Sequence, residues 1–134
     1  MPRLQLAAIS GLNVSLKWIK SIGIDQVYNE EQSNYKRLLE MLGNYENISV
    51  IPTGYAETIG VASCVFNGYC SDNIGKILSE KDVAVRTGLH CAPVAHKYLG
   101  TFPSGTVRFS VSYFNTDEDF EVLKEALDYI AQNS

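Results

Sequence analysis

Residues 86–93 read RTGLHCAP, and they directly follow the apolar residues VAV at 83–85. The stretch brings a guanidinium (Arg86), an imidazole (His90) and a thiol (Cys91) together on one glycine-containing turn after a strand. A free cysteine titrates near pH ~8.5, and a neighbouring cation such as Arg86 or a protonated His90 lowers that value. A small cysteine taken alone is as often an inert core residue, but these neighbours favour a reactive Cys91.

A second motif begins with the strand residues 106–111, TVRFSV. Side chains alternate along a strand, so Val107, Phe109 and Val111 point one way while Arg108 and Ser110 point the other. This alternation predicts that Arg108 faces away from the hydrophobic core and toward a ligand. An arginine suits a carboxylate because its planar fork makes two parallel hydrogen bonds, although a surface salt bridge is the alternative role for Arg108.

Together, the motifs at 86–93 and 106–118 resemble the C-terminal segment of cysteine desulfurases, which belong to the class V aminotransferase family of pyridoxal-phosphate (PLP) enzymes. The similarity extends from residue 9 to residue 130. It implies that residues 1–134 form a single domain, the small C-terminal domain of a fold-type I PLP-dependent transferase. It also implies that Cys91 is the nucleophile that becomes a persulfide, with His90 as a second catalytic residue. Arg108 would bind the substrate carboxylate, and Arg86 is the arginine that opens the cysteine loop and a second substrate-binding residue.

Two departures from the family pattern bear on the activity. Many desulfurases of this type carry His-His-Cys, whereas this chain has Leu89-His90-Cys91, so another class V lyase or aminotransferase activity stays open. The family's PLP-binding lysine belongs to a large domain that this sequence does not contain. PLP is therefore expected in the full-length enzyme but not covalently bound to this chain. The lysines lie in predicted helices or at their edges, without the family's lysine context: Lys17, Lys20, Lys36, Lys76, Lys81, Lys97 and Lys124.

Two further functional alternatives remain open. A thiol hydrolase could use Cys91 with His90, but adjacent side chains rarely point at each other and no orienting Asn or Asp is evident. The chain could also be an isolated fragment that only folds or pairs with another chain. His96 lies in a predicted short helical turn as an exposed or packing residue. Cys64 is expected in the core, and Cys70 precedes a helix.

Composition narrows the partners and the setting. The net charge is −4, with basic residues scattered rather than clustered, which argues against binding to nucleic acid or an anionic membrane. No apolar run approaches the ~20 residues of a membrane span, and the N-terminus lacks signal-peptide features, so a cytoplasmic protein is expected. Its three cysteines lack Cys-x-x-Cys spacing, and no metal site is expected. The expected partners are a small amino-acid substrate such as cysteine, a sulfur-acceptor protein and, in the full-length enzyme, a second copy forming a homodimer.

The periodicity of apolar residues alternates between helix and strand along the chain. Helices are predicted over 7–20 and 25–43, from a Ser71 or Asp72 cap, and from a capping box at Thr116. Because two of the predicted strands are apolar on both faces, we expect an α/β two-layer domain with helices packed on one side of a small mixed sheet. The predicted strands lie near 48–51, 61–66, 83–86 and 106–111.

Overall fold

The computed structural model describes residues 5–52 and 58–133. It contains helices and a four-stranded sheet, which confirms the predicted α/β class. In chain order the elements are α1 (Leu6–Ile22), α2 (Ile24–Gly43), β1 (Ile48–Val50), β2 (Val61–Phe66), α3 (Ser71–Glu80), β3 (Arg86–Gly88), α4 (Pro93–Tyr98), β4 (Thr106–Ser110) and α5 (Asp117–Gln132).

The strand order is β1-β2-β4-β3, and each of its pairs is antiparallel. The prediction of a mixed sheet was wrong in this respect. Between β3 and β4 the chain contains only the short helix α4, and it turns back on itself rather than making the long crossover that a parallel pair needs. As a result β4 occupies the interior of the sheet, between β2 and β3, and the two sequence motifs become neighbouring strands.

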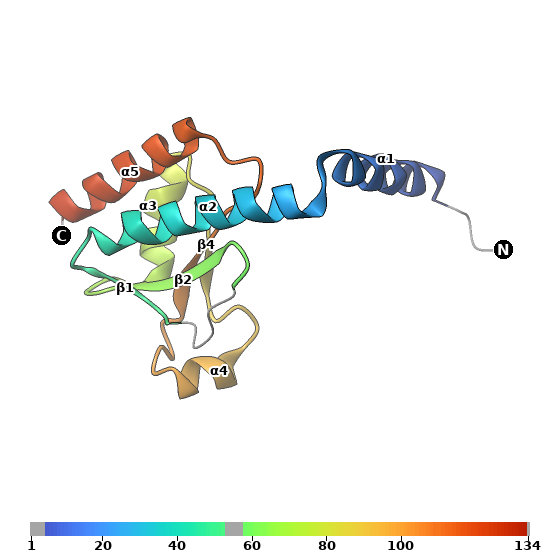
Figure 1. Cartoon of the computed structure of the whole chain (residues 1–134). Helices are drawn as coiled ribbons and strands as arrows, with labels where there is room; N and C mark the ends of the chain where they lie inside the picture. Colours follow the sequence, from blue (N-terminus) through green and yellow to red (C-terminus); the bar gives the residue numbers. More distant parts are fainter. Residues whose placement is uncertain (1–4, 53–57, 134) are drawn as a thin grey trace.

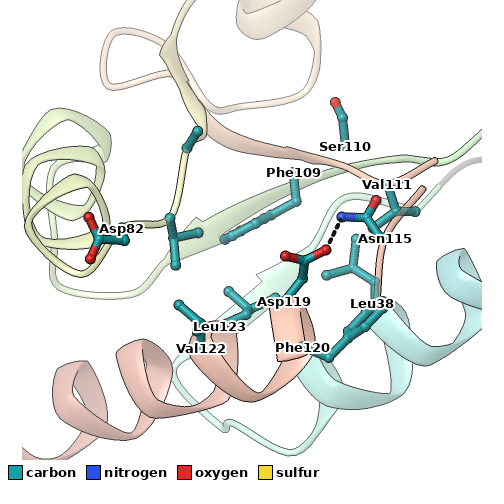
Figure 2. Close-up of a pocket in the computed structure, with 12 residues that line it drawn as sticks. Leu38, Asp82, Phe109, Ser110, Val111, Asn115, Asp119, Phe120, Val122 and Leu123 are labelled. Carbon is teal, nitrogen blue, oxygen red and sulfur yellow. Dashed lines mark hydrogen bonds between the residues drawn. The ribbon is translucent and has the colours of Figure 1, made fainter. Parts of the chain in front are cut away.

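The third strand is shorter and later than predicted, because pairing with β4 begins only at Arg86. Residues 83–85 are apolar because Val83 and Val85 pack against the core, and not because they join the ladder. Where this segment runs unpaired, it lines a cavity of about 360 Å³ together with the end of β4 and the first turns of α5. Figure 2 shows this cavity, with Phe109 and the hydrogen-bonded Asn115 and Asp119 at its wall.

Helices α2, α3 and α5 lie on one side of the sheet (Figure 1). Helix α4 lies apart from these three helices, at the opposite end of the domain. The core fills the space between this helical layer and the sheet. Its fully buried side chains come from both layers, as the predicted periodicities require: Leu38, Leu42, Cys64, Ile74, Leu78, Val107 and Leu127. The helical layer thus covers one face of the sheet and leaves the other face for the site.

Helix α1 forms as predicted, but none of its residues is buried and it extends away from the rest of the chain (Figure 1). Its apolar stripe is open to solvent, with Leu12, for example, 62% exposed. The helix contacts the domain through Trp18, whose ring stacks on Phe114 at 5.1 Å and meets Tyr113 edge-on at 5.3 Å. Within the described ranges, no helix is both long and apolar enough to cross a membrane.

The starts of α3 and α5 differ in how well the sequence predicted them. The capping box of α5 is present, with the Thr116 backbone N–H donating to Asp119 at 2.9 Å. In α3 the N-cap position is Cys70, which makes no side-chain cap, so the predicted Ser71 or Asp72 cap was wrong. Tertiary partners take both side chains: Ser71 donates to the Ser104 carbonyl, and Asp72 accepts from Thr87 at 2.8 Å.

Candidate functional site

A row of polar residues crosses the sheet on the face away from the helical layer. Arg108 of β4 lies directly opposite Ser63 of β2 on one side and Arg86 of β3 on the other. Directly opposed residues in antiparallel strands share a face. The neighbours of Arg108 in the strand, Val107 and Phe109, are buried in the core. Arg108 therefore points away from the core, as the alternation of the strand predicted.

Arg108 is only half-buried as a residue, but its Nε is buried and lacks a hydrogen-bond partner. No ion pair between described residues involves Arg86 or Arg108. A buried charged donor without a partner is costly, and structures normally satisfy such groups. The position therefore suits an anion that is not part of the described chain, such as a carboxylate.

His90 lies at the edge of this face, and a hydrogen bond to a residue of β4 holds its ring. Its Nε2 is 3.0 Å from Oγ1 of Thr106, two residues before Arg108 on the same face of the strand. Its Nδ1 is buried without a hydrogen-bond partner. Burial, followed by the nearby charges of Arg108, His96 and Arg86, lowers the pKa of His90 below its ordinary value. The imidazole is therefore neutral at neutral pH, and its buried Nδ1 has no hydrogen-bond partner.

The turn that carries Cys91 has an unusual backbone. His90 and Cys91 both have left-handed φ angles, +48° and +61°, which non-glycine residues rarely adopt. The Ala92 N–H closes the turn on the Leu89 carbonyl at 2.8 Å. Cys91 is exposed. Two consecutive strained residues are typical of functional turns, and they hold the thiol outside the core.

A close contact between two glycines joins the two motifs. A Cβ on Gly105 would lie 2.2 Å from the carbonyl carbon and oxygen of Gly88, so only glycine fits there. Gly105 also has a left-handed φ of +70°. This contact lets the end of β3 approach the start of β4, and it places the cysteine turn beside Thr106 and Arg108. In the connector between α4 and β4, residues 100–105, Gly105 is buried and Thr101 is half-buried, while the other four residues are exposed.

Two site residues were missed from the sequence. His96, in α4, is only 5% exposed and its ring lies 5.8 Å from that of His90. No local signal predicts its burial, because residues 99–105 must first fold back over α4. Thr106 could have been found, since it shares the strand face of Arg108 by the same alternation that identified Arg108.

The remaining thiols differ from Cys91. Cys64 is buried as predicted, and burial raises its pKa to about 12. Cys70 is exposed at the start of α3. Among the described residues, no group of three or more His, Cys, Asp or Glu side chains could hold a metal ion.

Comparison with known proteins identifies the family of the chain. The sequence profile of the family "Aminotransferase class-V" matches residues 4–123. A probable cysteine desulfurase of Pseudomonas putida is 33% identical over 92% of the chain. The structure of a cysteine desulfurase from Thermococcus onnurineus superposes on 92% of the chain with a TM-score of 0.83 and 28% identity. The Escherichia coli cysteine desulfurase CsdA, 23% identical with a TM-score of 0.83 over 98% of the chain, shares the fold.

The chain matches only part of the length of each of these proteins. The chain covers 29% of the Pseudomonas protein, 30% of the Thermococcus chain and 32% of the Escherichia coli chain. The chain therefore spans about a third of the length of the cysteine desulfurases that it matches. Members of this family use PLP. The profile match over most of the sequence places the chain in the aminotransferase class-V family.

Proposed function

We propose that this chain is the C-terminal small domain of a PLP-dependent cysteine desulfurase. In this proposal Cys91 is the persulfide-forming nucleophile, His90 assists it, and Arg108 binds the substrate carboxylate with Arg86 beside it. The single observation that carries the proposal is the buried, unpaired Nε of Arg108 next to the strained turn of His90 and Cys91. The similarity to cysteine desulfurases supports it.

The residues of this face divide the work. Arg108, opposite Arg86, supplies positive charge for the α-carboxylate of the amino acid. The exposed Cys91 thiolate then attacks the substrate sulfur: a new S–S bond forms, the substrate C–S bond breaks, and its electron pair stays with the substrate carbon. A proton taken up by that carbon completes the product. Cys91 is left as a persulfide, whose outer sulfur passes to an acceptor thiol.

The described residues fit an amino-acid substrate better than a cofactor. The unpaired donor on Arg108 matches a carboxylate, and we assign no PLP-holding residue to this chain. PLP, bound by another part of the enzyme, would supply the electron sink that makes the C–S bond cleavable. The cytoplasmic setting, the homodimer and the acceptor protein stay predictions.

His90 fits either of two roles beside Cys91. A neutral imidazole with Nδ1 open can accept a proton, which would help form the thiolate. Alternatively, the contact with Thr106 lets His90 serve only as an anchor for the turn. In the first role, activity falls as the pH drops through the lowered pKa of His90; in the second it does not.

Substitution of the two exposed cysteines tests the proposal in the complete enzyme. Cys91→Ala should abolish persulfide and sulfide formation from cysteine while leaving the PLP absorbance unchanged, because cofactor attachment lies elsewhere. Cys70→Ala is the matched control, since Cys70 is also exposed, and it should keep full turnover. Full turnover by Cys91→Ala would instead show that the nucleophile assignment is wrong, and the broader, cysteine-independent chemistry of the class V family would be the better account.

A further inference from the structure

The second histidine of the chain, His96, is buried more deeply than its partner His90. It projects from α4 and is 5% exposed, whereas His90 is half-buried. The two rings are tilted by 42° with their centres 5.8 Å apart. A buried imidazole that only filled space would cost more than an apolar side chain, so its polar contacts need an explanation.

Those contacts fix the orientation of the ring. Nδ1 of His96 lies 2.7 Å from Oγ1 of Thr101, and that hydroxyl donates its own proton to the His96 carbonyl at 3.5 Å. The contact with the carbonyl is the longer one, so the 2.7 Å contact with Nδ1 is the one that fixes the ring, in either tautomer. The backbone adds to this clamp, because the N–H groups of Thr101 and Phe102 both donate to the carbonyl of His96.

We propose that His96 is a positioning residue: clamped by Thr101, its ring backs the ring of His90 and holds that imidazole against Thr106. Only the catalytic purpose of holding His90 in place rests on the proposed function. The arrangement itself follows from the contacts. Two hydroxyls, one from Thr101 and one from Thr106 of β4, each hold one of the two imidazoles.

Tyr35, Val61 and Leu99 line the pocket beside His90 and His96, and the charged groups that act on His90 are basic. They come from three elements: Arg108 on β4, His96 on α4 and Arg86 on β3, and each lowers the pKa of His90 in addition to burial. Among the described residues, the ring of His96 is the one that packs on the ring of His90. Removing it should therefore both expose His90 and weaken the surrounding positive field, and both changes raise the pKa of His90.

Proton NMR titration of the 134-residue chain measures this directly, because the chain has only two histidines. In His96→Gln the single remaining imidazole should titrate at higher pH than the His90 signal of the unaltered chain. Lys97→Gln is the matched control from the same helix, with an exposed side chain, and should leave the His90 titration unchanged. Thr101→Val should shift His90 in the same direction as His96→Gln, and Thr101→Ser should restore the original titration.

An unchanged His90 titration in both His96→Gln and Thr101→Val would overturn the proposal, and so would an equal shift in Lys97→Gln. Thr101→Val keeps the test valid if His96→Gln does not fold. These measurements need no activity, so they stand apart from the Cys91→Ala test of the desulfurase function. In the complete enzyme, and in the role in which neutral His90 accepts a proton, His96→Gln should also move the acid limb of kcat/KM to higher pH.

Discussion

Arg86 and Arg108 lie directly opposite each other on neighbouring antiparallel strands, on the face of the sheet that the helical layer leaves open. Like charges directly opposite in a sheet are destabilising. No ion pair among the described residues relieves this repulsion, and the Nε of Arg108 is buried without a partner. The fold thus keeps a costly pair of cations, which is the expected arrangement where a site binds an anion.

Substitution of Arg108 should therefore separate stability from binding. Arg108→Gln removes the repulsion and the unpaired charge, so thermal unfolding of the chain should occur at the same or a higher temperature. In the complete enzyme the same substitution should raise KM for cysteine, with a loss of about 2 to 5 kcal/mol of binding free energy, typical of truncating one partner of a buried charge pair.

Arg37 provides the control for this experiment. It is a half-buried arginine that pairs with Asp117 and packs on Phe120, away from the site. Arg37→Gln should cost stability of up to about 1 kcal/mol and leave KM unchanged. If Arg108→Gln lowered stability and left KM alone, Arg108 would be a structural residue and the carboxylate assignment would be wrong.

Gly105→Ala should destabilise the domain. The added Cβ would overlap the backbone of Gly88 at 2.2 Å, and neither backbone can move without separating β3 from β4. The left-handed φ of Gly105 adds strain, so the expected loss of unfolding free energy is at least about 1 to 3 kcal/mol. Urea unfolding followed by circular dichroism measures it.

Gly43→Ala is the matched substitution at the end of α2, where a Cβ would meet nothing within 4 Å. It should be neutral or stabilise by up to about 1 kcal/mol, because alanine reduces the freedom of the unfolded chain. Equal stability of the two variants would show that the contact between Gly88 and Gly105 does not join the motifs.

Local patterns predicted most of the elements and the direction of Arg108, because alternation and helical periodicity are properties of neighbouring residues. The capping box at Thr116 and the buried Cys64 were predictable for the same reason. Antiparallel pairing, the late start of β3 at Arg86 and the burial of His96 were not, because each depends on how residues 89–105 fold back. The exposure of the apolar stripe of α1 was also not predicted, because a helical pattern of apolar residues does not show whether another element packs on them.

The carboxylate of Asp119 should contribute a pH-dependent part of the stability. The Thr116 backbone N–H and then the Asn115 side chain donate to it, and these hydrogen bonds lower its pKa. A group whose pKa is lower in the folded state stabilises above its unfolded pKa, and this contribution is lost as the pH falls through the folded pKa. Asp119→Ala should therefore lower the unfolding temperature at pH 7, with a smaller difference at pH 2.

Glu118 supplies the comparison for Asp119, because it is an exposed acidic residue in the same first turn of α5. Glu118→Ala should change the unfolding temperature less than Asp119→Ala at pH 7. An Asp119→Ala deficit that persists in full at pH 2 would mean that lost packing, and not the ionised cap, explains the effect.

The three cysteines should react with iodoacetamide in a defined order. Burial raises the pKa of the Cys64 thiol to about 12, so at pH 7 to 8 it has almost no thiolate and is shielded from the reagent. Cys70 and Cys91 are both exposed, so access does not separate them. Only Cys91 lies on the strained turn next to His90, on the face that carries the unpaired cation Arg108. We therefore expect Cys91 to be alkylated first.

Mass spectrometry of peptides after brief exposure gives the order, and Arg108→Gln tests its cause. If the positive field of this face activates Cys91, the substitution should slow alkylation of Cys91 and leave Cys70 unchanged, because Cys70 lies at the start of α3. Added alanine or another small carboxylate should also slow the Cys91 reaction, since an anion bound at Arg108 neutralises the same charge. Faster alkylation of Cys70 than of Cys91 in the unaltered protein would remove the chemical basis for Cys91 as the nucleophile, whatever the family resemblance implies.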